Sequence, residues 1–319
     1  MSEAPIPVIL DVDTGIDDAL AIALAVNHPR VALEAVTTVA GNVSLERTTA
    51  NSLRVLDWLG ARSVPVSMGA EGPLVGSRRE ASYWHAEDGL GGARLPESTR
   101  SADADAIGYL CERLLASPGT LTVVCTGPLT NVALALQREP RIVACVREVV
   151  LMGGAARLPG NITPVAEFNI YADPEAAARV FEQSWPITMV GLDVTERVRL
   201  ERADQVALSA DDSAGAVLLR EVCRFLFDER GVDSIALHDP LALAVAVQPD
   251  LVVTKVRDVR VETRGEHTRG QTVVDWRRTV EPAHGHTRVC TEVDVDRARA
   301  FFFTTLLGPA HRAGRRRTG

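Results

Sequence analysis

The sequence predicts an α/β protein with an open, mainly parallel, Rossmann-like sheet and helices on both of its faces. Two observations support this prediction. Short apolar runs rich in β-branched residues alternate with helical patterns at least five times along the chain. Polar residues also gather directly after the predicted strands, and the carboxyl ends of parallel strands are where such sheets bind ligands.

The first predicted strand, residues 7–10, leads into a cluster of acids. Asp11, Asp13, Asp17 and Asp18 place four carboxylates within eight residues. From Asp18 onward, Ala alternates with Leu and Ile, which predicts a helix packed on the sheet. Carboxylates this close raise one another's pKa unless a cation neutralises them. Crowded oxygen ligands without Cys favour Ca²⁺ or Mg²⁺.

The chain then continues the alternation of strands and helices. Apolar, β-branched runs predict strands at residues 32–39, 64–68, 120–125, 147–152 and 187–194. Helical patterns predict helices at residues 44–59, 104–116, from 131 onward and 173–183. Residues 70–103 are rich in Gly, Pro, Ser and charged residues, so they predict a long loop that is either functional or disordered.

The last third of the chain departs from this alternation. Residues 196–248 are predicted to be helical. Further strands are expected at residues 251–256, 272–275 and 288–293, and a terminal helix at 296–307. We find no repeat or linker, which predicts a single domain over residues 1–311. The Arg-rich residues 312–319 are predicted to be a disordered basic tail.

Composition limits the classes of partner and compartment. Lys and Arg number 34 against 42 Asp and Glu, and this net charge of −8 argues against a nucleic-acid partner. The five cysteines are odd in number and lack a CxxC pair, which predicts free thiols in a reducing compartment. We find no signal peptide and no apolar run long enough to span a membrane. The sequence therefore predicts a cytoplasmic protein without a membrane partner.

Polar residues follow several of the predicted strands. Asp13, Asn42, Thr126 and the Gly153-Gly154 turn all come directly after such strands. Right-handed crossovers place the carboxyl ends of parallel strands at one edge of the sheet. We therefore expect one cleft to gather these residues.

Eight short motifs follow one another along the chain. The first is Asp11-Val-Asp13-Thr-Gly15-Ile-Asp17-Asp18-Ala19. The others are Gly41-Asn42, Thr126-Gly-Pro-Leu-Thr-Asn131, Met152-Gly-Gly154, Gly160-Asn161, Ala166-Glu-Phe-Asn169, Asp173-Pro-Glu-Ala176 and His238-Asp239-Pro240. In this order and spacing the chain resembles the inosine–uridine-preferring nucleoside hydrolases, and in particular their His-Asp-Pro subgroup.

The resemblance implies hydrolysis of the N-glycosidic bond of a ribonucleoside to ribose and a free purine or pyrimidine base. It also implies a tightly bound Ca²⁺ held by the carboxylates of Asp13, Asp18 and Asp239 and by the backbone carbonyl of Thr126. Asp13 would in addition take the proton of the attacking water. Homodimers or homotetramers are the assemblies that the resemblance suggests.

The resemblance also assigns residues to the sugar and the base. The ribose hydroxyls would be held by Asp17, Asn42, Asn161, Glu167 and Asn169, and Met152 would also contact the substrate. His238 would protonate the leaving base and His85 would assist beside it. Carboxylates and amide oxygens suit the positive charge of an oxocarbenium-like transition state. A histidine suits proton transfer near neutral pH.

Other interpretations of these residues stay open. Asp11-Val-Asp13-Thr14 also imitates the nucleophile motif of haloacid-dehalogenase-type phosphatases. Those enzymes need a downstream lysine, and Lys255 is the only lysine in the chain. A non-catalytic nucleoside- or pentose-binding protein on the same scaffold is a further alternative. Met152 fits an apolar core, and the His238-Asp239-Pro240 segment fits an ordinary helix start.

Two positions depart from the family's pattern. Ala86 stands where the family often has Gly after the histidine. The segment around Phe225 and Phe227 lacks the tyrosine that some members place near the base. The preference for purine or pyrimidine bases is therefore left open.

Overall fold

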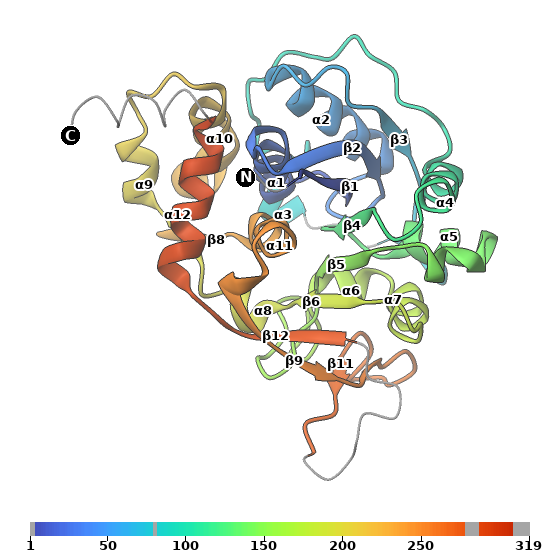
Figure 1. The fold of residues 1–319 in the computed structure, drawn as a ribbon. Helices are drawn as coiled ribbons and strands as arrows, with labels where there is room; N and C mark the ends of the chain where they lie inside the picture. The colour runs from blue at the N-terminus through green and yellow to red at the C-terminus, as the bar shows by residue number, and fades with distance from the viewer. Residues whose placement is uncertain (1–3, 79–81, 278–286, 309–319) are drawn as a thin grey trace.

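The computed structural model describes residues 4–78, 82–277 and 287–308, and it confirms the predicted α/β fold. Its main sheet has eight strands in the order β3-β2-β1-β4-β5-β6-β12-β9 (Figure 1). All neighbours pair in parallel except β12 and β9, which are antiparallel. The strands are β1 (Ile6–Val12), β2 (Val31–Thr38), β3 (Val66–Met68), β4 (Thr122–Cys125), β5 (Glu148–Met152), β6 (Ile187–Val190), β9 (Val252–Arg257) and β12 (Thr287–Val293).

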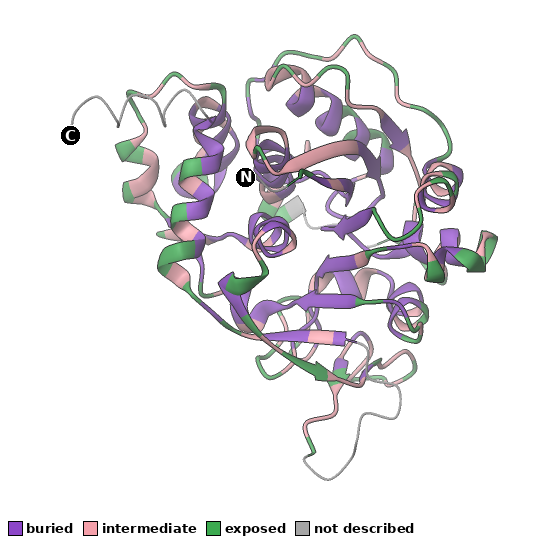
Figure 2. Ribbon diagram, in the orientation of Figure 1, coloured by how far each residue is buried: buried purple, intermediate pink, exposed green. Residues whose placement is uncertain are grey.

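Helices cover both faces of this sheet (Figure 1). One face packs against α1 (Ile16–Asn27), α2 (Leu45–Trp58) and α11 (His238–Val247). Two further helices extend this layer outward: α10 (Ala214–Arg224) packs on α1, and α12 (Val295–Leu306) packs on α1 and α11. The other packs against α4 (Ala106–Ala116), α5 (Thr130–Arg138) and α7 (Pro174–Phe181). Because side chains alternate along a strand, Val8 and Leu10 of β1 enter the first core and Ile9 enters the second. The central strands and α11 are accordingly buried (Figure 2).

Shorter elements complete the described fold. Four are helices of four to six residues: α3 (Ser82–His85), α6 (Phe168–Ala172), α8 (Leu192–Thr195) and α9 (Arg202–Ala207). Two are 3₁₀ turns, Pro140–Ala144 and Pro249–Leu251, and Phe225–Glu229 is a π-helical turn that continues α10. Two small antiparallel sheets pair β7 (Arg199–Glu201) with β8 (Ser234–Ala236) and β10 (Val259–Val261) with β11 (Thr272–Val274).

The structure corrects three details of the sequence prediction. The helical prediction for residues 196–248 is wrong at β7 and β8, because these three-residue strands depend on pairing with each other across the intervening helices. The strand predicted at residues 187–194 ends at Val190, since Gly191 is the N-cap of α8, which begins at Leu192. The loop predicted at residues 70–103 contains α3. The predicted tail at residues 312–319 lies outside the described residues.

Local sequence explains where several helices begin. Side chains accept hydrogen bonds from backbone N–H groups at the first turns of α2, α4, α7, α10 and α12, and the residues responsible are Ser44, Asp105, Asp173, Ser213 and Asp294. Pro174 occupies the first turn of α7, where its missing N–H costs nothing. None of the described helices is long and apolar enough to cross a membrane.

The strand register brings the polar strand ends together. Val12 pairs with Thr38, Asp11 pairs with Cys125, and Cys125 pairs with Leu151. The residues that follow β1, β2, β4 and β5 therefore meet at one edge of the sheet, as the sequence predicts.

Candidate active site

Three acids follow the end of β1. Val12 is the last residue of the strand, and Ile16 is the first of α1, so Asp13 lies in the turn and Asp17 and Asp18 lie in the first helical turn. Asp13 and Asp18 have no exposed surface, and Asp17 is partly buried. Asp17 and Asp18 lie where the helix dipole favours negative charge, but that effect contributes only about 1 kcal/mol. The buried acids therefore need further compensation.

Only one oxygen of the Asp13 carboxylate has a hydrogen-bond partner among the described residues. Its Oδ2 accepts a hydrogen bond of 2.7 Å from the backbone N–H of Asn42, which follows β2. Its Oδ1 is buried and has no hydrogen-bond partner among the described residues. Burial first, and then the negative charge of Asp18, raises the pKa of Asp13 well above its usual value. A cation beside this oxygen would reverse both effects.

Asp18 is held by donors from three segments. Its Oδ1 accepts a hydrogen bond of 2.6 Å from the Thr126 hydroxyl. Its Oδ2 accepts hydrogen bonds from the backbone N–H of Gly15 at 2.9 Å and from the Asn42 amide at 3.2 Å. Burial and the charge of Asp17 nevertheless raise the pKa of Asp18 to about 6. The rise shows how strongly buried negative charge is disfavoured here.

Asp239 joins the acids from the first turn of α11. Its side chain is 3% exposed, and one carboxylate oxygen from each of Asp17, Asp18 and Asp239 lies within 4.8 Å of the other two. Burial, followed by the charges of Asp17, Asp18 and Asp13, raises the pKa of Asp239 well above its usual value. Clustered oxygen donors of this kind fit a hard divalent cation.

The grouping of acids differs in one detail from the ligand set that the resemblance implies. The compact group contains Asp17, which the resemblance assigns to the sugar. Asp13 lies close enough to raise the pKa of Asp239 but is not part of that group. Asp17 and Asp239 both line the cavity described below, so the Asp17 carboxylate can serve a ligand as well as a cation.

The ends of β4 and β5 meet at Asn169. Its Nδ2 donates to the Thr126 carbonyl at 2.6 Å and to the Met152 carbonyl at 3.2 Å, and the Met152 sulfur lies 3.5 Å away. A carbonyl oxygen has two lone pairs, so the Thr126 carbonyl can still meet a cation. Asn169 is thereby fixed against both strand ends.

Glu167 has a structural task that the sequence did not indicate. It caps α6 and accepts hydrogen bonds from the backbone N–H groups of Gly154 at 2.9 Å, Asn169 at 2.8 Å and Ile170 at 3.1 Å. Asn161 accepts a hydrogen bond of 2.9 Å from the N–H of Phe168. Both polar side chains therefore order the segment that carries Asn169, while they also face the cavity.

A cavity of about 710 Å³ opens above the acids. The predicted site residues that line it are Asp17, Asn42, His85, Thr126, Met152, Asn161, Glu167, Asn169, His238 and Asp239, whereas Asp13 and Asp18 lie buried behind its wall. Sequence patterns did not indicate several other lining residues, namely Tyr83, Trp84, Ile162, Phe168, Glu196, Arg199, Leu226, Val232 and Ile235. Most of these lie on segments whose positions depend on the tertiary fold. Lys255 is exposed on the edge strand β9 and does not line the cavity, which removes the support for a phosphatase.

Two histidines line the cavity and have different partners. The backbone N–H of Ile16 donates to His85 Nδ1 at 3.0 Å. His238 Nδ1 lies 2.8 Å from the hydroxyl oxygen of Thr195, a buried residue of α8 that no sequence motif indicates. Burial lowers the pKa of both histidines, while the charge of Asp17 opposes that shift.

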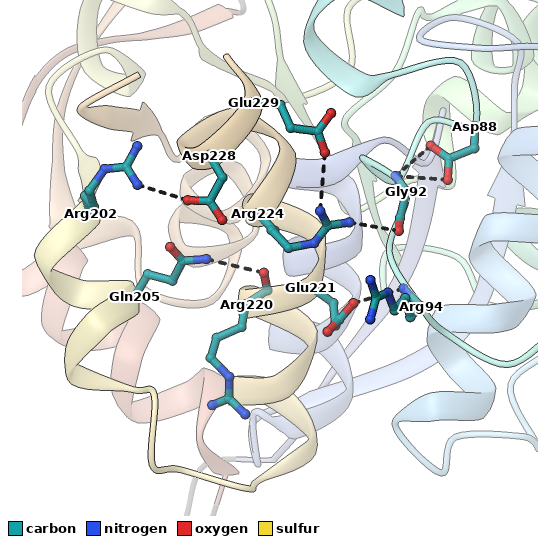
Figure 3. Close-up of polar contacts among 10 residues, drawn as sticks. All are labelled: Asp88, Gly92, Arg94, Arg202, Gln205, Arg220, Glu221, Arg224, Asp228 and Glu229. Atoms are coloured by element: carbon teal, nitrogen blue, oxygen red, sulfur yellow. Dashed lines mark hydrogen bonds and ion pairs between the residues drawn. The ribbon is translucent and has the colours of Figure 1, made fainter. Parts of the chain in front are cut away.

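The loop after His85 is fastened to α10 and the π-helical turn (Figure 3). Arg224 donates to the carbonyl of Gly92 and to Glu229, both at 3.3 Å. Glu221 accepts a hydrogen bond of 3.0 Å from the N–H of Arg94. Within the loop, Asp88 accepts hydrogen bonds of 3.1 Å from the N–H of Gly92. These contacts join two segments that are distant in sequence.

Asp11 is buried within β1 and is hydrogen-bonded to β2 and to α5. Its Oδ1 accepts hydrogen bonds from the Thr37 hydroxyl at 2.6 Å and the Asn131 amide at 2.7 Å. Its Oδ2 is buried without a hydrogen-bond partner among the described residues. Burial is the main cause that raises the pKa of Asp11 to about 6.

The groups around the cavity are suited to three tasks. The buried carboxylates can hold a cation and take a proton from water. Amide and carboxylate groups along one wall can bind the hydroxyl groups of a sugar. The two histidines, with apolar and aromatic neighbours such as Phe168 and Trp84, can receive a heterocyclic base.

Comparison with known proteins agrees with this chemistry. The family model described as inosine-uridine preferring nucleoside hydrolase matches residues 8–300. An inosine-uridine preferring nucleoside hydrolase from Leishmania major is 40% identical over 299 residues, which cover 92% of this chain and 95% of the relative. A pyrimidine-specific ribonucleoside hydrolase, RihA from Citrobacter koseri, is 41% identical over 277 residues, which cover 85% and 88% of the two chains.

Solved structures resemble the whole fold. A plant nucleoside hydrolase, the PpNRh1 enzyme, superposes with a TM-score of 0.89 at 34% identity, covering 96% of this chain and all of the other. A purine-preferring ribonucleoside hydrolase from Gardnerella vaginalis superposes with a TM-score of 0.88 at 34% identity, with coverages of 94% and 98%.

Proposed function

The chain belongs to the inosine-uridine preferring nucleoside hydrolase family, and on that premise we propose that it is a Ca²⁺-dependent ribonucleoside hydrolase that releases ribose and a free base. The observation that carries the proposal is the group of Asp17, Asp18 and Asp239 at the floor of the cavity, beside the unpaired Oδ1 of Asp13. Buried carboxylates with raised pKa values need a cation, and an all-oxygen donor set suits Ca²⁺.

In this proposal the ion is held by Asp13, Asp18, Asp239 and the carbonyl of Thr126. When bound, Ca²⁺ would supply positive charge that makes water more acidic and orients hydroxyl groups. Asp13 accepts the proton of the attacking water, since its Oδ1 has no other partner among the described residues.

The ribose is held along the wall of the cavity. Asp17, Asn42, Met152, Asn161, Glu167 and Asn169 are the residues proposed to contact it. Negative carboxylates near the sugar stabilise the positive charge that develops as the glycosidic bond breaks. The hydrogen bonds of Glu167 and Asn169 to the backbone keep these groups in place before substrate arrives.

His238 delivers a proton to the leaving base. As the C–N bond breaks, its electron pair passes to the base nitrogen, and the proton neutralises the base. Burial lowers the pKa of His238, so its imidazolium gives up a proton more readily, while the charge of Asp17 opposes that shift. The contact with Thr195 holds the ring. His85 assists on the same side of the cavity.

We further propose a single domain over residues 1–311, a cytoplasmic location and a homodimer or homotetramer. The choice of base is left open, because the relatives include proteins named pyrimidine-specific and purine-preferring. The chain also has no tyrosine in the π-helical turn that borders the cavity.

The test is release of base and reducing sugar from inosine, uridine, cytidine and adenosine by the Ca²⁺-loaded protein. Asp13→Asn preserves the shape of the side chain and should abolish turnover, whereas Asp212→Asn, at an exposed aspartate, is the matched control and should turn over like the wild type. Dialysis against a chelator should remove activity, and added Ca²⁺ should restore it. If the loaded wild type cleaves none of the four nucleosides, the assignment is wrong.

A second measurement addresses His238. His238→Ala should lose far more activity on inosine than on a p-nitrophenyl riboside, because nitrophenolate leaves without a proton. Equal losses on the two substrates would contradict the proton-donor role.

A further inference from the structure

We propose that His85 acts on the leaving base as a neutral hydrogen-bond donor through Nε2, locked in that tautomer by the first N–H of α1. This inference rests on the proposed function and divides the work of the two cavity histidines. His238 supplies the proton, and His85 keeps its own.

The tautomer follows from the contact with Ile16. A backbone N–H can only donate, so the Nδ1 atom that accepts it at 3.0 Å must offer a lone pair. A neutral imidazole with a lone pair on Nδ1 carries its proton on Nε2. Nε2 is therefore the ring nitrogen left to meet a ligand, and it can only donate.

The helix makes the contact persistent. Ile16 is the first residue of α1, so its N–H has no acceptor within the helix. His85 provides that acceptor at the positive end of the helix dipole. Protonation of Nδ1 would break this bond and also place a positive charge beside the helix N-terminus.

Packing fixes the ring in the same position. A Cβ atom at Gly15 would overlap Nδ1 and would lie 2.7 Å from Cε1 of His85, so the ring rests on the bare glycine backbone. The carbonyl of His85 accepts a hydrogen bond of 3.0 Å from the N–H of Gly91. The loop beyond it is held to α10 through Arg224 and Gly92 (Figure 3).

Among the described residues, the charges of Asp17 and His238 act on the His85 ring. Asp17 favours an imidazolium, whereas His238 opposes one. Burial is the largest influence and favours the neutral ring, and the net result is a pKa below the ordinary value. The electrostatic surroundings thus agree with the tautomer that the geometry requires.

The partner of His238 imposes no such restriction. The Thr195 hydroxyl can either donate to Nδ1 or accept from it, so His238 can hold one proton or two. The two rings line the same cavity, yet only His238 has a partner compatible with the imidazolium form.

The chemical consequence concerns the base as it departs. Purine and pyrimidine bases carry ring nitrogens and oxygens that become more negative when the glycosidic electron pair reaches them. A fixed N–H donor stabilises that charge without losing its proton. The ligand that His85 recognises is therefore a heterocycle with a hydrogen-bond acceptor on the side of His85.

Three substitutions at His85 separate the contributions of the two ring nitrogens to activity. In His85→Gln the amide nitrogen reaches the position of Nε2 and preserves the donor. In His85→Asn the side-chain oxygen occupies the position of Nδ1, which preserves only the acceptor for Ile16. His85→Ala removes both. We expect kcat/KM on inosine or uridine to stay within about tenfold of wild type in the Gln variant and to fall roughly 100-fold in Asn and Ala, as for loss of one donor to a developing anion.

Nuclear magnetic resonance reads the tautomer without any substrate. Two-bond ¹H–¹⁵N correlations of the Ca²⁺-loaded protein, with His85 assigned by its absence in His85→Gln, should show a bare Nδ1 and a protonated Nε2 from pH 5.5 to 8. Protonation of Nδ1 within this range would overturn the proposal. A kcat/KM of His85→Gln as low as that of His85→Ala would overturn it as well. Failure of the wild type to cleave nucleosides would instead contradict the proposed function, because the resonance result does not depend on turnover.

Discussion

Replacing Asp11 by Asn should weaken the dependence of stability on pH in the metal-free protein. The folded protein holds Asp11 with a pKa of about 6, against 3.8 for the ordinary group, mainly because of burial and with a smaller contribution from the charge of Asp18. The folded state therefore binds this proton more tightly than the unfolded state. The advantage of a protonated Asp11 is fully present below pH 3.8 and is lost as the pH rises through about 6.

The magnitude follows from the shift. A difference of about two pKa units corresponds to roughly 3 kcal/mol of unfolding free energy at pH 8. Asn carries no ionisable proton, and its oxygen can keep the hydrogen bonds from Thr37 and Asn131. The free energy of unfolding of Asp11→Asn minus that of wild type should therefore rise by about 2–3 kcal/mol between pH 4 and pH 8.

Urea unfolding followed by circular dichroism, in chelator and at unit steps of pH, measures this difference. Asp212→Asn is the matched control at an exposed aspartate, and its curve should run parallel to wild type. Saturating Ca²⁺ should flatten the curve of the wild type, because a nearby cation favours the ionised carboxylate. A difference between Asp11→Asn and wild type that stays constant or falls with pH would refute the reasoning.

Three further changes probe the geometry of the site. A Cβ at Gly41 would overlap the Asp13 carboxylate and displace it, so Gly41→Ala should lower kcat/KM by about 100-fold. Gly72→Ala is the control, because a Cβ there meets nothing within 4 Å, and its kcat/KM should equal that of wild type. Ala86 has a φ of 60°, so Ala86→Gly should relieve backbone strain of about 1 kcal/mol, seen as a raised Tm; an unchanged or lowered Tm would contradict this. Thr195→Val removes the hydroxyl that contacts His238 while the side-chain volume stays the same. It should lower kcat on inosine about tenfold, as for loss of one hydrogen bond, whereas Thr195→Ser keeps the hydroxyl and should have the kcat of wild type.

The sequence was most informative about the main sheet. Runs such as residues 7–10 and 120–125 are short, apolar and rich in β-branched residues, so their length and composition identify β1 and β4. The positions of Asp13, Asn42 and Thr126 followed from the rule that parallel strands end at one edge. The structure brings these residues together as expected.

The elements that were missed depend on distant partners. β7 and β8 are three residues long and pair with each other across α9 and α10, so no local pattern marks them. The contact between His85 and Ile16 joins a loop to a helix start, and neither residue indicates the other in the sequence. The structural task of Glu167 likewise depends on the turn at Gly154, because backbone N–H groups leave no sequence signal.

The order of the proposed ion ligands along the chain determines when during synthesis the ion can bind. Of the three carboxylates proposed to hold the ion, those of Asp13 and Asp18 emerge from the ribosome early, whereas that of Asp239 emerges only after most of the chain has been made. An ion that needs all three carboxylates cannot bind a nascent fragment that stops before α11. Metal uptake would therefore coincide with completion of the fold, and the ion would stabilise only chains whose first and last thirds have already met.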